Sequence, residues 1–253
     1  MRMKCLLAVF LLGLVGAYTP PECCPARWGD IGALFPLPRD CLDIRDWGGQ
    51  RTGVYVIYPQ SIENCRPVRV WCDQSQNNGG WTVIQRRVDG SVDFLRNWDS
   101  YRTGFGSVAG EHWIGLENMH HLTIQGRYEI RIEIEDFNGQ GRTADYRLFR
   151  VGNELSNYTL QVTGFQGGGA GNGLSIHNGM PFSTIDRDND PWARNCAQEY
   201  TGAWWYKACF TANLNGQYLR GSTTMYGKGI VWSPWRGYNY SFRRVEMKIR
   251  RNN

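Results

Sequence analysis

The sequence predicts an α+β fold, in which an antiparallel sheet is accompanied by a few short helices and a long loop-rich region. Residues 128–135 alternate apolar with charged side chains, the pattern of a strand with one buried and one wet face. From residue 164 to residue 240 this periodicity fades and glycine and asparagine become frequent, yet several tryptophans and tyrosines lie there. We therefore expect an ordered loop region that something other than strand pairing holds in place.

Residues 1–17 have the pattern of a secretory signal peptide. Arg2 and Lys4 precede an apolar run, and the small residues Gly16 and Ala17 stand before Tyr18. No later segment approaches the roughly twenty apolar residues that cross a bilayer. We expect a secreted, extracellular protein without a membrane span, whose mature chain begins near Tyr18.

The first regular elements follow a short leader, residues 18–40, which contains proline and cysteine. A short helix is expected at residues 42–47. Runs of β-branched and aromatic residues between turn signals then predict strands at residues 53–58, 67–72 and 81–87.

Further short helices are expected in the middle of the sequence, at residues 98–104 and 116–122. The strand at residues 128–135 is the clearest of all, and residues 146–151 and 158–162 continue its pattern. No internal repeat, collagen-like run or heptad segment interrupts this order.

Basic residues gather near the C-terminus, in residues 243–251, where they alternate with apolar residues. The alternation is typical of a half-buried strand whose wet face is basic. For an exported protein with a formal net charge of only +5, a solvated face is a better interpretation than a nucleic-acid surface. No nucleic-acid partner is expected.

The four histidines do not accompany a serine or cysteine nucleophile motif. We interpret His112, His120, His121 and His177 as hydrogen-bonding side chains. The protein is therefore not expected to be an enzyme.

Asp186, Asp188 and Asp190 occupy alternate positions in the sequence DRDND. Their charges repel one another unless a cation lies among them, and alternate residues of extended backbone point to one side. Ca²⁺ is the natural occupant, but not in an EF-hand, because Pro191 and Ala197 stand where that loop has its glycine and glutamate. The alternative is a solvated turn, which Asp and Asn also favour.

Removal of Cys5 with the signal peptide leaves an odd number of cysteines, so one has no partner within the same molecule. Cys23 or Cys24 is the obvious candidate for a bridge between two molecules, which would make a disulfide-linked homo-oligomer. The alternative is a pairing with a small thiol or one free, unreactive cysteine.

Several ordered motifs resemble those of fibrinogen-related domains: CLDI from Cys41, VWCD ending at Asp73, GGWTVIQRRVDGSVDF, HNGMPFST, DRDND, GAWWYKAC and LNGQYLRG. The likeness runs from about Cys41 to Arg250 and places the domain at residues 41–253. Within the family the sequence is most similar to ficolins and tachylectin-5 type lectins, which bind acetylated sugars. The resemblance implies a small N-terminal β subdomain, a central antiparallel sheet completed by the C-terminal strand, and a loop-rich subdomain that carries calcium and ligand.

The resemblance also implies the disulfides. The expected bridges are Cys41 to Cys72, Cys196 to Cys209, and Cys65 to either Cys23 or Cys24. The remaining N-terminal cysteine then suits a covalent dimer.

The same resemblance implies two sets of site residues. Calcium would be held by the carboxylates of Asp188 and Asp190 and the backbone carbonyls of Trp192 and Arg194. An acetyl group would meet tyrosine walls and the N–H groups of Cys209 and its neighbour, beside a cis peptide between Ala208 and Cys209. The expected ligand-binding residues are Tyr200, Ala208, Cys209, Phe210, Tyr226 and Tyr238.

Two residues depart from the family pattern: Phe210 stands where most relatives have histidine, and Ala208 replaces a polar residue. The pocket is therefore expected to be more apolar than in relatives. The sequences NYT at Asn157 and NYS at Asn239 are glycosylation acceptors in an exported protein.

The function expected from this resemblance is a secreted calcium-binding lectin for acetyl groups on microbial or other cell-surface glycans, active in innate immune recognition or agglutination. The alternative is a fibrinogen-like protein that binds a peptide or receptor in adhesion, clotting or signalling. Tyr200 and Gly227 stand where fibrin-type pockets use aspartates, which argues against a clotting protein.

Overall fold

The computed structural model describes residues 37–59 and 66–252. The predicted signal peptide, most of the predicted leader, and Cys23, Cys24 and Cys65 with their predicted bridges lie outside these residues. Within them, no helix combines the length and apolarity that crossing a membrane requires.

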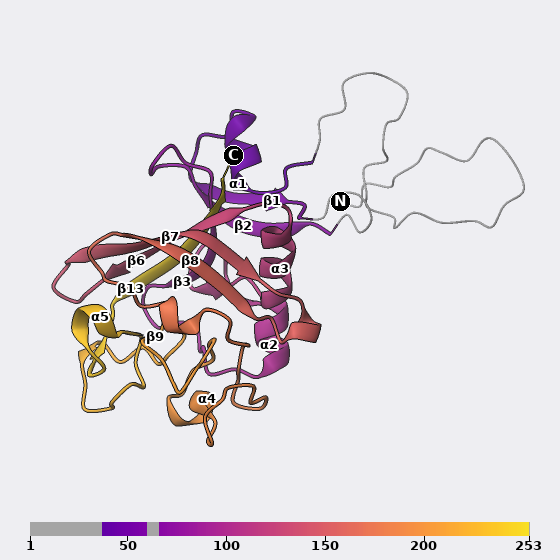
Figure 1. Ribbon diagram of the computed structural model, residues 1–253. Coiled ribbons are helices and arrows are strands. Elements are labelled where there is room, and N and C mark those ends of the chain that lie inside the picture. The colour runs from indigo at the N-terminus through magenta and orange to yellow at the C-terminus, as the bar shows by residue number, and fades with distance from the viewer. Residues whose placement is uncertain (1–36, 60–65, 253) are drawn as a thin grey trace, which may run out of the picture.

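Nine strands of the described residues form one sheet, which runs diagonally through the molecule (Figure 1). Its main path has the order β1–β2–β3–β13–β6–β7–β8, with every neighbouring pair antiparallel, while β5 pairs with β3 and β4. Because β13 lies between β3 and β6, the C-terminal strand completes the middle of the sheet, as predicted. The strands are β1 (Gly53–Ile57), β2 (Val68–Asp73), β3 (Trp81–Arg87), β4 (Phe105–Gly106), β5 (His112–Trp113), β6 (Tyr128–Glu135), β7 (Gly141–Val151), β8 (Leu160–Gly167) and β13 (Arg244–Arg251).

The three predicted helices are present and are capped by polar side chains or by glycine. Asp40 accepts hydrogen bonds from the N–H groups at the start of α1, and Asn97 does so for α2. Gly115 precedes α3 and has a positive φ of 99°. The helices are α1 (Cys41–Asp46), α2 (Trp98–Thr103), α3 (Leu116–Ile124), α4 (Cys196–Glu199) and α5 (Ser233–Arg236), with 3-10 turns at Glu154–Ser156 and Ser175–His177.

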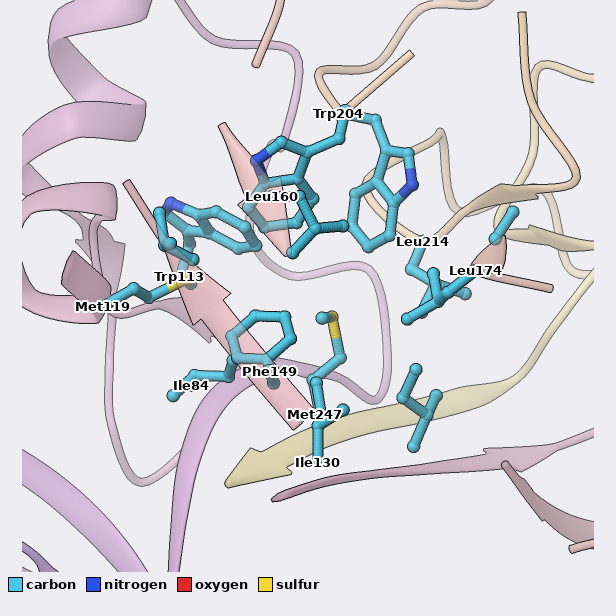
Figure 2. Close-up of a cluster of buried hydrophobic side chains, with 14 of the residues drawn as sticks. Ile84, Trp113, Met119, Ile130, Phe149, Leu160, Leu174, Trp204, Leu214 and Met247 are labelled. Atoms are coloured by element: carbon cyan, nitrogen blue, oxygen red, sulfur yellow. The ribbon is translucent and has the colours of Figure 1, made fainter. Parts of the chain in front are cut away.

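The hydrophobic core lies between the inner face of the sheet, α3 and the loop region. Figure 2 shows Ile130, Phe149 and Met247 of the sheet facing indole rings, with Trp204 and Leu214 contributed by the loop region. All of these side chains are buried. The two regions therefore share one core, and neither buries its apolar surface alone.

The loop region, residues 168–241, contains little regular structure. Its strands have two residues each, and the rest of its order comes from scattered backbone hydrogen bonds and from side chains that bond backbone groups. The indole N–H of Trp232 donates to the carbonyl oxygen of Ala170 (3.0 Å), and Asn215 Nδ2 donates to that of Ala203 (2.9 Å). The short strands are β9 (Ala212–Asn213), β10 (Gly221–Ser222), β11 (Val231–Trp232) and β12 (Tyr240–Ser241).

The predicted wet basic face of the C-terminal strand is wrong, although the strand itself is present as β13. Lys248 is fully buried, and its Nζ lies 2.7 Å from carboxylate oxygens of both Asp73 and Glu133. Strands β2 and β6 bring these carboxylates to the lysine, so the charge is compensated inside the fold instead of being solvated. Only Arg243 and Arg244, at the start of the strand, keep about half of their side-chain surface exposed.

Candidate functional site

The residues predicted to bind calcium and ligand lie in two adjoining parts of the loop region. One is the acid loop, residues 186–196, and the other is the aromatic cage, formed by Tyr200, Phe210, Tyr226 and Tyr238. The Cys196–Cys209 disulfide joins them, and a second disulfide joins Cys41 to Cys72. Both bridges agree with the prediction.

Asp186 does not share the role of the two other aspartates in the acid loop. Its Oδ1 accepts hydrogen bonds from the N–H of Trp98 (2.9 Å) and the hydroxyl of Thr184 (2.7 Å). These bonds tie the loop to the start of α2. Asp186 is therefore a structural anchor, and the remaining carboxylates are those of Asp188 and Asp190.

Asp190 is held in place by backbone donors. Its Oδ1 accepts from the N–H of Trp192 (2.9 Å) and its Oδ2 from the N–H of Cys196 (3.0 Å). Burial raises the pKa of the Asp190 carboxyl to about 6, and the nearby Asp188 carboxylate adds to the rise, although both N–H donors oppose it. Asp188 and Asp190 thus place two carboxylates close together, and a bound cation would offset their repulsion.

The chemistry of these donors fits Ca²⁺. Within the described residues, no group of three or more His, Cys, Asp or Glu side chains is arranged to hold a metal, so an ion here needs carbonyl ligands as well. The carbonyl oxygens of Trp192 and Arg194 accept no hydrogen bond from any described residue. The guanidinium of Arg194 is directed to Glu199 and the ring of Trp192, so it leaves the aspartates uncompensated.

The aromatic cage is assembled from residues up to 38 positions apart, whose rings contact one another in succession. Phe210 packs edge-on against Tyr200 (4.9 Å between centroids) and against Tyr238 (5.7 Å), and Tyr226 stacks on Tyr238 (5.1 Å). Phe210 is only 6% exposed, whereas Tyr226 is 53% exposed. The buried ring forms the floor of the cage and Tyr226 forms its open rim.

Hydrogen-bond donors stand beside these rings. The peptide bond between Ala208 and Cys209 is cis, as predicted. Neither Cys209 nor Phe210 donates its N–H to another described residue, while the carbonyl of Phe210 accepts from the hydroxyl of Tyr238 (3.1 Å). Two backbone donors next to an apolar surface can bind a carbonyl oxygen whose neighbouring methyl group is buried.

Gly227 closes one side of the cage. A Cβ atom at this position would lie 2.7 Å from Cδ1 of Tyr200 and 3.1 Å from Cζ of Phe210, and the backbone has a φ of +72°. Only glycine fits both the conformation and the contact. The side of the cage at Tyr200 and Gly227 is therefore aromatic and carries no carboxylate of its own.

The cage also depends on three residues that the sequence did not identify as part of it. The ring of Tyr206 contacts Phe210 (5.9 Å between centroids), and its hydroxyl donates to Oδ1 of Asn213 (2.9 Å). Asn213 Nδ2 in turn bonds the carbonyl oxygens of Tyr200 and Gly227. Asn213 directly precedes the LNGQYLRG motif, but nothing in the local sequence indicates which backbone groups it would meet.

His177 is the third of these residues and is fully buried. Its Nδ1 donates to the carbonyl of Trp205 (2.7 Å), and its Nε2 accepts from the N–H groups of Thr211 and Ala212 (3.3 Å each). Burial lowers the pKa of this imidazole to about 4. A neutral histidine therefore holds the segment that directly follows Phe210.

A cavity of about 280 Å³ lies elsewhere, beside β2, β4 and β5. It does not include any residue of the acid loop or the aromatic cage. Its lining includes Arg66, Arg69, Phe105, His112 and Asn118. The cage is thus a surface site that is separate from this cavity.

The two predicted glycosylation acceptors differ in their surroundings. Asn239 is exposed and follows Tyr238 of the cage, and its Nδ2 donates to the carbonyl of Thr223 (3.1 Å). Asn157 is partly buried, and its Oδ1 accepts from Arg187 (2.7 Å). Asn239 is therefore the acceptor beside the cage.

Comparison with known proteins gives a consistent set of relatives. The family model described as fibrinogen beta and gamma chains, C-terminal globular domain, matches residues 37–252. Human microfibril-associated glycoprotein 4 is 48% identical over an alignment of 259 residues that covers 98% of this chain and all of the relative. Fibrinogen C domain-containing protein 1-B of Xenopus laevis is 49% identical over 84% of this chain and 47% of its own length.

Solved structures have the same fold. The fibrinogen-like globe domain of human ANGPTL2 matches with a TM-score of 0.82 and 44% identity, covering 85% of this chain and all of that domain. Lamprey fibrin D-dimer, complexed with the peptide Gly-His-Arg-Pro-amide, matches with a TM-score of 0.78 and 34% identity over 88% of this chain and 79% of its own. These similarities extend over the sheet and the loop region alike.

Proposed function

The protein belongs to the family described as fibrinogen beta and gamma chains, C-terminal globular domain, and we propose that it is a secreted, non-enzymatic lectin that recognises acetyl groups. Its targets are N-acetylated sugars on microbial or other cell-surface glycans, and its roles are innate immune recognition or agglutination. This proposal rests on the aromatic cage and on the adjacent N–H groups of Cys209 and Phe210, which donate to no other described residue.

An N-acetyl group consists of a methyl group beside an amide. The cage offers apolar ring surface for the methyl, and the two N–H groups offer donors for the carbonyl oxygen. Phe210 and Ala208 add no charge or hydrogen-bonding side chain, so the selection is for the acetyl group and less for the identity of the sugar ring. The buried ring of Phe210 gives this preference its apolar character.

Calcium has a supporting role in this proposal. The carboxylates of Asp188 and Asp190 and the carbonyls of Trp192 and Arg194 would hold the ion, which neutralises the acid loop when bound. The Cys196–Cys209 disulfide connects that loop to the cage. Calcium would therefore stabilise the binding surface without touching the sugar.

A single cage binds weakly. Burial of one methyl group contributes about 1 kcal/mol, and one net hydrogen bond contributes about as much. Together they amount to about 2 kcal/mol, which corresponds to a dissociation constant on the order of tens of millimolar. A disulfide-linked oligomer through Cys23 or Cys24 would supply avidity by presenting several cages to a repetitive surface.

The alternative function is binding of a basic peptide end or a receptor, and one observation argues against the peptide. The lamprey fibrin structure holds a peptide with an arginine, whereas the matching side of this cage consists of Tyr200 and Gly227 without a carboxylate. A cationic group would lose hydration there, and the neighbouring carboxylate of Glu199 is already paired with Arg194 (3.5 Å). The geometry supports a neutral acetyl ligand better.

Competition on acetylated beads in the presence of Ca²⁺ tests the proposal. N-acetylglucosamine, N-acetylgalactosamine and simple acetylated compounds should elute the protein, and glucosamine should not. Tyr226→Ala should abolish retention, because it removes the rim of the cage. Trp47→Ala is the matched control, since Trp47 is a similarly exposed aromatic residue (48%) on the helix α1 side of the molecule, and it should behave as wild type.

Equal elution by glucosamine, or normal retention of Tyr226→Ala, would exclude the acetyl cage. Retention on immobilised Gly-His-Arg-Pro-amide without any response to acetylated sugars would support the peptide alternative. Mass spectrometry of the bound fraction adds a further check, because a glycan on Asn239 would crowd the cage. We expect the retained fraction to be depleted of that glycan relative to the unretained one.

A further inference from the structure

Three exposed arginines lie together on the outward face of the sheet, far from the acid loop and the cage in sequence. Arg127 directly precedes β6, and Arg147 and Arg150 belong to β7. We call these three residues the arginine strip. Their strand neighbours Tyr128, Tyr146 and Phe149 point into the core, so the arginines project from the opposite face.

The strand register brings the strip together. Tyr128 pairs with Phe149 in the antiparallel β6–β7 ladder, so the next residues outward, Arg127 and Arg150, stand opposite each other. Asn252 connects Arg127 with Arg147: its backbone N–H donates to the carbonyl of Arg127 (2.7 Å), and its Nδ2 donates to that of Arg147 (3.2 Å). Asn252 therefore fixes the spacing of the strip.

The strip has no internal counterion. The nearest carboxylates on the same strands are already occupied, Glu129 by Arg250 (2.7 Å) and Asp145 by Arg131 (2.6 Å). Among the described residues, no ion pair or side-chain hydrogen bond involves the guanidinium groups of Arg127, Arg147 or Arg150. Like charges placed opposite one another across strands destabilise a sheet, so the fold itself gains nothing from this arrangement.

We infer that the arginine strip binds a sulfated glycosaminoglycan. Such a polymer carries anionic groups along its length, and a guanidinium can bind a sulfate or carboxylate through two parallel hydrogen bonds. Gln161 and Thr163 of β8, both exposed and paired with Arg150 and Leu148, add donors for sugar hydroxyls. The signal-peptide pattern places the protein where sulfated glycans, and not nucleic acids, are the abundant linear polyanions.

The strip and the cage lie at opposite ends of the molecule. The C-terminus, whose Asn252 bonds to Arg127, lies beside α1 in Figure 1, whereas the orange and yellow loops that contain the cage lie at the other end. One molecule can therefore hold a sulfated glycan and an acetylated glycan at the same time. The strip does not depend on the cage, so each can be lost without the other.

Titration of heparin into the whole protein at several salt concentrations tests this inference. The variant Arg127→Ala/Arg147→Ala/Arg150→Ala should lose roughly 30-fold in affinity near physiological salt, and its slope of log K against log salt should fall by about 2 to 3, because fewer counterions are released. The matched control is Arg51→Ala/Arg66→Ala/Arg69→Ala, which removes the same charge from other exposed arginines. It should change the affinity by about threefold or less, as an effect of net charge alone.

Equal losses in the two triple variants would show that net charge and not the strip binds heparin, and would overturn the inference. Duplex DNA bound as tightly as heparin, or desulfated heparin bound as tightly as the sulfated form, would overturn it as well. Arg127→Lys/Arg147→Lys/Arg150→Lys keeps the charge but removes the planar fork, and should bind between wild type and the alanine variant. Unchanged thermal unfolding of each variant shows that the fold is intact.

Discussion

The central sheet and the loop region bury similar aromatic and aliphatic side chains in one core, yet they satisfy their backbones differently. In the sheet, each strand donates to and accepts from its neighbours, as in the eight-residue ladder between β13 and β6. In the loop region, backbone hydrogen bonds are scattered, and side chains such as Asn213, Asn215 and His177 bond further backbone groups. Strand pairing uses most backbone N–H and carbonyl groups of the sheet, whereas side chains bond only some of those in the loop region.

This difference explains where the candidate site lies. A strand residue in the interior of a sheet uses its N–H in the ladder, so it has none to offer a ligand. Tyr238, His177 and the disulfide hold this segment through the Phe210 carbonyl, the Ala212 N–H and the Cys209 sulfur. The N–H groups of Cys209 and Phe210 therefore donate to no other described residue. The irregular region can therefore present backbone donors on a well-ordered surface.

The largest expected effect concerns a charge buried in the sheet. Lys248→Ala leaves Asp73 and Glu133 without their shared cation, which should lower the free energy of unfolding by about 3–5 kcal/mol. Denaturant unfolding measures the loss, and Arg244→Ala, on the exposed start of the same strand, should change it by about 0.5 kcal/mol or less. If both variants lose the same free energy of unfolding, the buried ion pairs of Lys248 do not stabilise the sheet as expected.

The two disulfides provide a matched pair for the two regions. Replacement of both cysteines by alanine should cost about 3 kcal/mol for Cys196–Cys209, which spans 13 residues, and about 4 kcal/mol for Cys41–Cys72, which spans 31. Only the first replacement should abolish retention on acetylated beads, because only that bridge holds the cage. Loss of binding in both would mean that the cage has no local support of its own.

Acid should weaken the loop region through His177. Its folded-state pKa of about 4 lies below the ordinary value of 6.5, so the unfolded protein binds more protons between these pH values and stability falls as the pH decreases through this window. The difference between the two pKa values corresponds to a loss of roughly 3 kcal/mol in the free energy of unfolding by pH 4.

Urea unfolding of wild type and His177→Gln at pH 7 and pH 4.5 isolates this contribution, because burial also lowers the pKa of His112 in the sheet. The variant should be less stable at pH 7 and less sensitive to acid than wild type. Parallel pH profiles of the two proteins would contradict the assignment.

The smallest expected effect is that of calcium. Ca²⁺ at one hundred times its dissociation constant should stabilise the fold by about 2.7 kcal/mol. Asp188→Asn/Asp190→Asn should remove this gain. Calorimetry with Ca²⁺ and with EDTA measures it, and hydrogen exchange should show the protection concentrated in residues 186–210 and absent from β6 and β13. Identical melting of wild type under both conditions would refute the calcium site.

The sequence alone determined most of the regular fold. The bounds of β3 and β6 agree with prediction, β6 because its alternation depends only on which face is buried, and β3 because β-branched and aromatic residues favour a strand even where both faces are buried. The helices α1, α2 and α3 and both described disulfides were also predicted, the latter from the family resemblance. Family motifs likewise indicated which loop residues form the candidate site.

Tertiary structure decided the charges and the contacts between distant residues. The burial of Lys248 depends on carboxylates from two other strands, and the structural role of Asp186 depends on an N–H in α2. The undonated N–H groups of the cage and the uncompensated guanidinium groups of Arg127 and Arg150 have the same origin. Periodicity reports which face of an element is apolar, but the partner of a polar group is whatever the fold brings within about 3 Å, and local sequence carries no record of it.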